Sequence, residues 1–230
     1  MKKKRIVVLT GAGISAESGL QTFRDADGLW EGHSVYDVAT PEAWQRDPVM
    51  VQEFYNIRRR SVRQAQPNEA HKALVLLEER YDVQIVTQNI DDLHERAGSS
   101  QVTHLHGIIT KSQSERYPHL TYDIDGEELR MGDLCEKGHQ LRPHVVWFGE
   151  PVPMIEKAIE LCQTAAIFIV IGTSLQVYPA AGLIDVVPPD TEIYLIDPKT
   201  TVRHSNKVNY IQEKAVMGVP ALVKQLLDAE

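Results

Sequence analysis

Cysteine, positive charge and long apolar runs are all scarce in this chain of 230 residues. The apolar run near its start, IVVL, is far too short for a signal peptide or a membrane span. The two cysteines, Cys135 and Cys162, are too few for a disulfide framework, and neither has a CxxC partner. Because 24 basic residues stand against 32 acidic ones, the net charge is −8, and nucleic-acid binding would need a local basic stripe. We therefore expect a cytoplasmic protein that binds neither membranes nor nucleic acids.

The chain does contain short apolar runs that alternate with helical patterns. With 43% hydrophobic residues, it is long enough for one main core and a small insert. Buried strands are predicted at 5–10, 82–87, 165–171 and 192–196. Helices are predicted at 47–64, 69–80, 90–97, 151–164 and 218–229. This alternation predicts an α/β fold with a parallel sheet.

A glycine turn follows the first predicted strand. The segment GAGISA at 11–16 matches the G-x-G-x-x-G/A fingerprint, in which glycines let the backbone approach a pyrophosphate at the start of a helix, expected here from residue 14. By itself the match does not distinguish a phosphate cradle from an ordinary tight turn. A dehydrogenase would place a second strand soon afterwards, whereas 23–32 is polar and patternless and predicts a loop over the site.

Polar side chains are densest at 87–107, TQNIDDLHERAGSSQVTHLHG. His106 ends a strand expected at 102–106, and ligands bind at the carboxyl ends of strands in doubly wound sheets. A lone histidine in this place is more often a satisfied core residue, so the alternative for His106 is a purely structural one. We expect His104 to be structural.

The predicted helix at 47–64 has two faces of interest. Val51, Phe54 and Ile57 recur at helical spacing and predict its buried face. Tyr55 and Arg58 lie three residues apart on another face, where the local sequence favours a solvated pair.

The segment 110–140 is polar and rich in turn residues, and it predicts an insert in the main domain. A small hairpin is expected around Asp125 and Gly126.

Several long motifs together carry a resemblance that the glycine fingerprint alone does not. They are GAGISAESGL at 11–20, FRDADGLW at 23–30, TQNIDDLHERAG at 87–98, HLHG at 104–107, RPHVVWFGE at 142–150 and GTSLQVYPAA at 172–181. In this order, and over nearly the whole chain, they resemble the sirtuins, which are NAD-dependent protein-lysine deacylases.

The resemblance implies a Rossmann-like doubly wound parallel sheet with a small inserted domain. The large domain would comprise 1–32, 72–109 and 141–230, and two inserts, 33–71 and 110–140, would form the small one. NAD as co-substrate and an acylated lysine of a protein or peptide would bind between them. The implied products are nicotinamide, O-acyl-ADP-ribose and free lysine. One alternative is a non-catalytic NAD or ADP-ribose sensor with the same fold. Another, an oxidoreductase, is disfavoured by the missing second strand.

The resemblance also assigns site residues by motif position. His106 would be the general base, and Asn89 would assist catalysis. The positions implied to contact NAD are Gly11, Ala12, Gly13, Phe23, Arg24, Trp30, Gln88, Asn89, Ile90, Asp91, Gly172, Thr173, Ser174, Asp197 and Ala215. Val146, Trp147 and Phe148 fall in the segment that would bind the substrate peptide by main-chain pairing.

Three further residues resemble the desuccinylase- and demalonylase-like branch of the family. In that branch a Tyr-x-x-Arg pair reads a carboxylate at the far end of the acyl chain, and a small residue precedes Thr-Pro. The matching residues are Tyr55, Arg58 and Ala39. The resemblance therefore implies a preference for succinyl or malonyl over acetyl groups, because a guanidinium presents a bidentate fork to a carboxylate.

The chain departs from the family where most sirtuins bind a structural zinc through two cysteine pairs. It has Ser114 and Tyr117 at the first pair, and Cys135 and Gly138 at the second. One thiolate cannot make such a site, so we expect no metal and a small domain that relies on its own packing.

Overall fold

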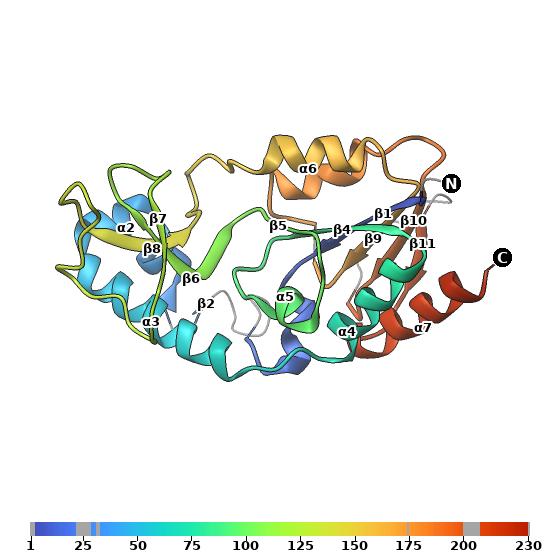
Figure 1. Cartoon of the computed structure of the whole chain (residues 1–230), viewed down its shortest axis with the longest axis horizontal. Coiled ribbons are helices and arrows are strands. Elements are labelled where there is room, and N and C mark those ends of the chain that lie inside the picture. The colour runs from blue at the N-terminus through green and yellow to red at the C-terminus, as the bar shows by residue number, and fades with distance from the viewer. Residues whose placement is uncertain (1–2, 22–28, 31–32, 174, 200–207, 230) are drawn as a thin grey trace.

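The computed structural model describes residues 3–21, 29–30, 33–173, 175–199 and 208–229. Six parallel strands form the main sheet in the order β11-β10-β9-β1-β4-β5 (Figure 1). Their bounds are β1 (Arg5–Thr10), β4 (Asp82–Thr87), β5 (Val102–His104), β9 (Ile167–Ile171), β10 (Glu192–Ile196) and β11 (Val208–Ile211). The chain proceeds outward from β1 in one direction and from β9 in the other, so the expected doubly wound topology is confirmed. Thr10 pairs with both Thr87 and Ile171, which sets the carboxyl ends of β1, β4 and β9 level.

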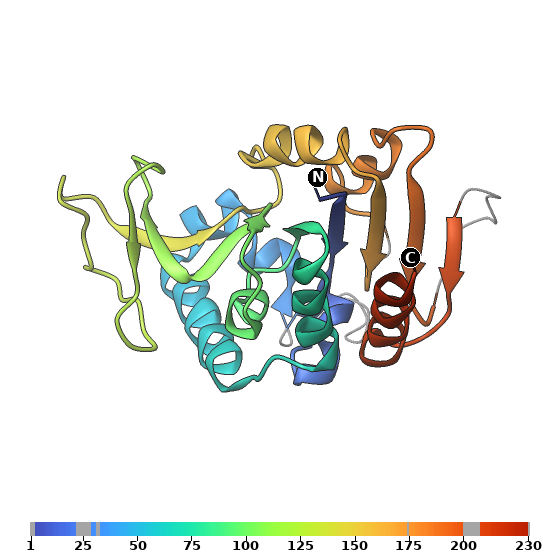
Figure 2. The same cartoon turned by 45° about the vertical axis from the view of Figure 1, so that its right-hand side comes forward.

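Helices cover both faces of this sheet (Figures 1 and 2). On one face lie α4 (Glu69–Leu76) and α7 (Ala215–Asp228), and on the other lies α6 (Ile155–Cys162). The alternation along β1 explains the two cores, since Ile6 and Val8 pack in the first and Val7 and Leu9 in the second. No helix among the described residues is long and apolar enough to span a membrane.

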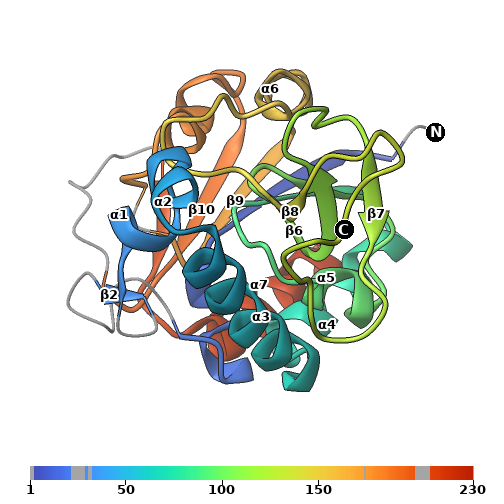
Figure 3. The ribbon, with the colours of Figure 1, turned by 90° about the vertical axis from the view of Figure 1, so that its left-hand side faces the viewer.

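A second, antiparallel sheet of three strands stands beside the main one. Its order is β7-β6-β8, and its strands are β6 (Gly107–Ser114), β7 (Thr121–Asp123) and β8 (Leu141–Val145). Figure 3 looks at this end of the molecule and shows α3 (Pro48–Gln64) next to the small sheet. The shorter elements are α1 (Val35–Val38), α2 (Pro41–Arg46), α5 (Leu93–Ala97), β2 (Leu29–Trp30), β3 (His33–Ser34) and the 3-10 turns η1 (Ala12–Ile14), η2 (Ala16–Ser18), η3 (Leu77–Glu79) and η4 (Ala180–Asp185).

Helix α3 holds the insert through buried polar side chains. Arg59 is fully buried and donates from Nε to the Ile109 carbonyl at 2.7 Å and from Nη1 to Asn56 Oδ1 at 2.7 Å. Asn56 in turn bonds both backbone groups of Leu129, at 3.0 and 3.1 Å. Burial lowers the pKa of Arg59 to about 10, so it stays charged at neutral pH.

Three local predictions were wrong. In place of the helix expected from residue 14 there are two short 3-10 turns, and Gly19, in a left-handed conformation with φ +89°, ends the second. The small hairpin turns between β6 and β7 at 115–120, and the segment around Asp125 only follows it. Ile57 is 40% exposed, while Tyr55 and Arg58 are 0% and 6% exposed, so the expected pair on a solvated face is buried.

Hydrogen bonds and ring contacts involve Cys135, Ser114 and Tyr117, three of the positions at which the resemblance implied zinc-binding cysteines. Cys135 Sγ lies 3.4 Å from Ser114 Oγ, and the same hydroxyl accepts from the Tyr117 amide at 3.2 Å. The ring of Tyr117 packs edge-on against His139, and the Lys137 ammonium lies 4.3 Å from its centre. In the described part of the chain, no three His, Cys, Asp or Glu side chains converge as a metal site would require.

These contacts predict that the small sheet is stable without zinc. We expect the purified protein to contain far less than one zinc per chain, and a chelator to leave its urea unfolding curve unchanged. Asn56→Ala serves as a positive control: it strands two backbone groups of Leu129 and should lower the free energy of unfolding by about 2 kcal/mol. One equivalent of zinc, or destabilisation by the chelator, contradicts the prediction.

Candidate active site

A single cavity of about 870 Å³ runs along the carboxyl edge of the main sheet and reaches α3. It brings together residues predicted from distant parts of the sequence. Those predicted to contact NAD are Gly11, Ala12, Gly13, Gln88, Asn89, Ile90, Asp91, Gly172, Thr173, Asp197 and Ala215. With His106 they share the cavity with the predicted substrate residues Ala39, Tyr55, Arg58, Val146, Trp147 and Phe148.

Four of the predicted positions cannot be placed in this cavity. Phe23, Arg24 and Ser174 lie outside the described residues. The backbone of Trp30 belongs to β2, but its side chain is outside the description.

Two glycine turns meet at the floor of the cavity. The amide of Gly13 donates to the Gly172 carbonyl at 2.9 Å. A Cβ atom on Gly13 would lie 2.6 Å from Gly172 Cα, closer than real Cβ atoms come, and Gly172 itself has φ +61°. Glycine is therefore required at both positions, and the floor consists of bare backbone, as a bound pyrophosphate needs.

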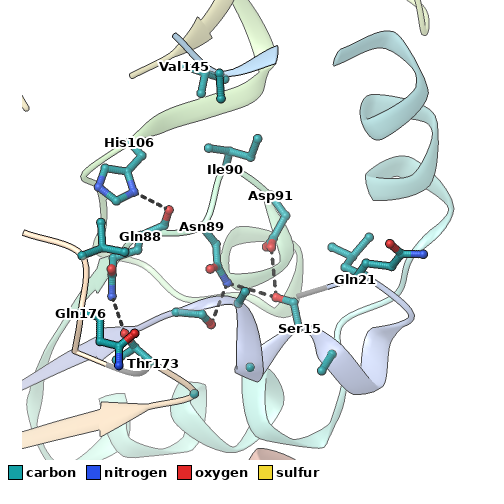
Figure 4. A pocket seen from close by; sticks show the side chains of 18 of the residues that line it. Ser15, Gln21, Gln88, Asn89, Ile90, Asp91, His106, Val145, Thr173 and Gln176 are labelled. Atoms are coloured by element: carbon teal, nitrogen blue, oxygen red, sulfur yellow. Dashed lines mark hydrogen bonds between the residues drawn. The ribbon is translucent and has the colours of Figure 1, made fainter. Parts of the chain in front are cut away.

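The orientation of Asn89 follows from its neighbours (Figure 4). Its Nδ2 lies 3.2 Å from the Gly11 carbonyl and 3.2 Å from Ser15 Oγ. Because a carbonyl can only accept, the amide nitrogen must face Gly11, and both of its hydrogens are engaged. Ser15 donates to Asp91 Oδ2 at 3.0 Å, so the carboxylate positions the hydroxyl that holds Asn89. This arrangement leaves the side-chain oxygen of Asn89, Oδ1, to accept a hydrogen bond from a ligand.

The imidazole of His106 is oriented by the other half of the same polar stretch. Its Nδ1 lies 2.9 Å from the Gln88 carbonyl oxygen (Figure 4). Since that oxygen can only accept, Nδ1 carries the proton and Nε2 is the bare nitrogen. Burial lowers the pKa of His106 below its ordinary value of 6.5, although the bond to Gln88 acts in the opposite direction. A neutral ring with a basic Nε2 is therefore the form present at neutral pH.

His104 has different surroundings, two residues earlier. Its Nδ1 lies 3.0 Å from the backbone carbonyl oxygen of Asn89, and its Nε2 lies 2.8 Å from Glu95 Oε1, so both nitrogens face acceptors. Burial disfavours its charge, but the Glu95 carboxylate outweighs this and raises the pKa of His104. The ring supports the backbone of Asn89 from outside the cavity.

The segment after β8 is fixed at both ends to the rest of the site. The Val146 amide donates to the His106 carbonyl at 2.9 Å, and the Phe148 amide donates to the Ala39 carbonyl at 2.9 Å. The Trp147 amide donates to Glu150 at 2.8 Å. The Trp147 carbonyl also accepts, from the Glu150 amide at 3.0 Å, so an extended peptide would have to pair with the other carbonyl groups of this segment.

Ser15 is the site residue that the sequence did not predict. It is 1% exposed, lines the cavity and bonds both Asn89 and Asp91. The sequence did offer one indication of this role, since Ser15 lies two residues after the second glycine of the fingerprint. In a doubly wound fold that glycine turn lies beside the carboxyl ends of the neighbouring strands.

The fold and site together define a Rossmann-type dinucleotide-binding protein with a small sheet beside its cavity. The sequence profile described as the Sir2 family matches residues 11–179. An NAD-dependent protein deacylase of Helicobacter pylori is 52% identical over 226 residues, which cover 98% of each chain. One of Bacteroides thetaiotaomicron is 52% identical over 230 residues and covers 97% of this chain and 98% of that protein.

Solved structures agree with these sequence comparisons. The crystal structure of a Sir2 homolog in complex with NAD superposes with a TM-score of 0.88 at 38% identity, covering 99% of this chain and 91% of that chain. The chain belongs to the Sir2 family, the sirtuins, as its motifs predicted.

The environment of His106 predicts the pH dependence of turnover. If neutral His106 is the base, activity falls as the pH drops through its pKa, and burial places that pKa below 6.5. We expect the acid limb of the kcat/KM profile, measured with an acylated lysine peptide, to have its midpoint below pH 6.5. A midpoint clearly above that value would contradict the assignment.

Proposed function

We propose that this chain is an NAD-dependent protein-lysine deacylase that prefers succinyl or malonyl over acetyl groups. The large domain (1–32, 72–109 and 141–230) and the small domain (33–71 and 110–140) would contribute the two sides of the cavity. The observation that carries the proposal is the shared cavity, which holds the His106 imidazole at one place and the Tyr55–Arg58 pair at another. The names of the curated relatives agree with the predicted enzyme class and with NAD as co-substrate.

The residues present fit NAD along the length of the cavity. The glycine floor accommodates the pyrophosphate, and Asp197 after β10 and Ala215 at the start of α7 line the same end. At the other end, the side-chain oxygen of Asn89 can accept a hydrogen bond from the carboxamide of nicotinamide. When bound, NAD supplies the ribose carbon to which the acyl oxygen adds as nicotinamide leaves.

His106 acts after that bond has broken. Its bare Nε2 takes the proton of a ribose hydroxyl, which makes that oxygen a better nucleophile toward the acyl carbon. The Nδ1 proton bonded to Gln88 keeps the ring in the required tautomer and favours the charge it gains. Asn89 would position nicotinamide, and the Gln88 carbonyl orients His106. Because the two residues are neighbours in one loop, nicotinamide and the base are positioned together.

The acyl end of the cavity offers two oriented hydrogen-bond donors. Tyr55 Oη accepts from Trp147 Nε1 at 3.0 Å, which fixes the position of the phenol beside the cavity. Burial raises the pKa of Tyr55, so the phenol stays protonated. Arg58 lies one helical turn away and lines the same cavity, where its guanidinium can bind a carboxylate in bidentate fashion. Ala39, 3% exposed, leaves room that a bulky side chain would fill.

The Trp147 indole is itself fixed in place. The Arg142 guanidinium stacks on it with its carbon 3.9 Å from the ring centre, and Arg142 is paired with Glu150 at 2.7 Å. The charge of Arg142 is thus matched by Glu150, so we assign Arg142 a structural role at this end of the cavity.

A non-catalytic NAD or ADP-ribose sensor is the alternative, and turnover separates the two. We expect nicotinamide release from NAD only when an acyl-lysine peptide is present, and a loss of at least about a hundredfold in His106→Tyr. Retained binding of ADP-ribose by the variant, measured by calorimetry, shows that it still folds. Peptide-independent release, or none in the wild type, contradicts the deacylase proposal.

Arg58→Met tests the acyl preference. A hydrogen bond to a charged group is worth roughly 1.5–3 kcal/mol, so kcat/KM for a succinyl-lysine peptide should fall about ten- to a hundredfold. The value for the matching acetyl-lysine peptide should change less than about threefold, because an acetyl group carries no charge.

Arg60→Met is the matched control for this variant. Arg60 lies on the same helix and pairs with Glu53 at 3.0 Å, away from the cavity lining. It should leave the succinyl-to-acetyl ratio unchanged. The preference is refuted if wild-type protein processes both peptides equally well, or if succinyl activity survives Arg58→Met.

A further inference from the structure

Two histidine side chains hold the loop after β4 where its pairing with a neighbouring strand ends. The last register pair of β4 and β5 is Thr87 with His104. Beyond it, His106 bonds the Gln88 carbonyl from inside the cavity, and His104 bonds the Asn89 carbonyl from outside it. The proposed reaction uses the first of these rings and gives the second no part.

Both nitrogens of the His104 ring face oxygens that accept. Nδ1 lies 3.0 Å from the backbone carbonyl oxygen of Asn89, and Nε2 lies 2.8 Å from Glu95 Oε1 on α5. Burial acts to raise the pKa of Glu95, but the bond to His104 and its charge outweigh burial and lower it, so Glu95 is ionised at neutral pH. A neutral imidazole has one proton and can satisfy only one of these acceptors, whereas an imidazolium satisfies both. The geometry therefore favours the charged ring.

The titratable groups around this ring also favour its charge. Burial acts to lower the pKa of His104, but Glu95 and, more weakly, Asp91 act in the opposite direction, and the net effect raises it. The neighbouring rings are His94 on α5 and His144 on β8. Burial lowers the pKa of both, so they are neutral at neutral pH and do not oppose the charge of His104.

The charge of His104 acts on a second member of the site, Asp91. This side chain is 6% exposed, and its two oxygens accept from the Leu93 amide at 3.1 Å and from Ser15 at 3.0 Å, as an ionised carboxylate can. Burial raises the pKa of Asp91, while these two bonds and the charge of His104 act to lower it. Because Ser15 also bonds Asn89 Nδ2, an ionised Asp91 helps to keep the Asn89 side chain in its orientation.

We propose that His104 acts as an imidazolium and is a positioning residue for the nicotinamide end of the site. It holds the backbone of Asn89 by a bond to its carbonyl, and it supplies a positive charge to the buried carboxylate of Asp91. When the ring loses one proton, the other stays on Nε2, because the Glu95 carboxylate is a stronger acceptor than a carbonyl. Nδ1 is then bare, and the Asn89 carbonyl loses its donor.

This role predicts that the two histidines limit activity from opposite sides of the pH scale. The raised pKa of His104 means that its contribution is complete below pH 6.5, the ordinary value, and is lost as the pH rises through the raised value. His106 must be neutral to act as the base, and its pKa lies below 6.5. The proposal rests on the proposed contact of Asn89 with nicotinamide, so ligands with and without nicotinamide should respond differently.

Nitrogen NMR of the histidine rings tests the charge without any ligand. At pH 6.5, where an ordinary histidine is half protonated, both ring nitrogens of His104 should have mainly the shifts of an imidazolium. The variant His104→Gln identifies the signals by their loss. Glu95→Gln removes the carboxylate that favours the charge and should move the midpoint to lower pH. A ring that is mainly neutral at pH 6.5, or a midpoint unchanged in Glu95→Gln, overturns the proposal.

Calorimetry tests the positioning role. The ligands are carba-NAD, which cannot be cleaved, and ADP-ribose, which lacks nicotinamide, each beside a succinyl-lysine peptide. Between pH 6.5 and about 9, the wild-type Kd for carba-NAD should rise about five- to tenfold, and that for ADP-ribose less than about twofold. His104→Gln keeps a donor but has no charge. At pH 6.5 it should bind carba-NAD as weakly as the wild type does at the higher pH, with no further pH dependence.

His139→Gln is the matched control. His139 is another half-buried histidine, and it packs against Tyr117 away from the cavity lining. This variant should keep the wild-type pH dependence. Wild-type binding of carba-NAD that does not change with pH, or equal weakening of ADP-ribose, overturns the positioning role. Failure of the proposed function has a different signature, because carba-NAD would then not bind the wild type at either pH.

Discussion

The contact between two glycine turns at the switch point of the main sheet is the constraint on which the rest of the site depends. Gly13 and Gly172 approach so closely that a single added Cβ would overlap the opposite backbone. With no side chain between them, the turns that follow β1 and β9 pack backbone against backbone at the floor of the cavity. The same closeness places Ser15 where Asn89 and Asp91 from the end of β4 can bond it.

The residues proposed for the reaction and those proposed for acyl selection lie in different parts of the molecule. The loop after β4 supplies Asn89 and, through the Gln88 carbonyl, the tautomer of His106. The residues that we propose to read the acyl group lie on α3, which packs against the small sheet and not against the main core. The segment after β8 joins the two, since its amides bond the backbones of His106 and Ala39. A change on α3 can therefore alter specificity while the base and its support remain intact.

Most strands and long helices could be predicted because apolar periodicity reports them directly, as the agreement of β4 and α3 with their predicted ranges shows. The errors arose where the local pattern had no access to distant partners. Arg58 reads as a solvated residue on α3, yet it lines a cavity built by segments far away in the sequence. Ile57 reads as core and faces solvent. The β6–β7 turn was misplaced because a polar insert offers several turn signals and pairing selects among them.

By itself, the sequence determined the order of strands and helices, the glycine turns and the family, because these depend on short segments with strong local patterns. Only the tertiary structure decided the chemical state of the polar groups. The Gln88 carbonyl decides which nitrogen of His106 is bare, and the Gly11 carbonyl decides which way the side-chain amide of Asn89 is turned. A hydrogen-bond partner fixes which atom donates, and partners at this site come from strands that are neighbours in the sheet and distant along the chain.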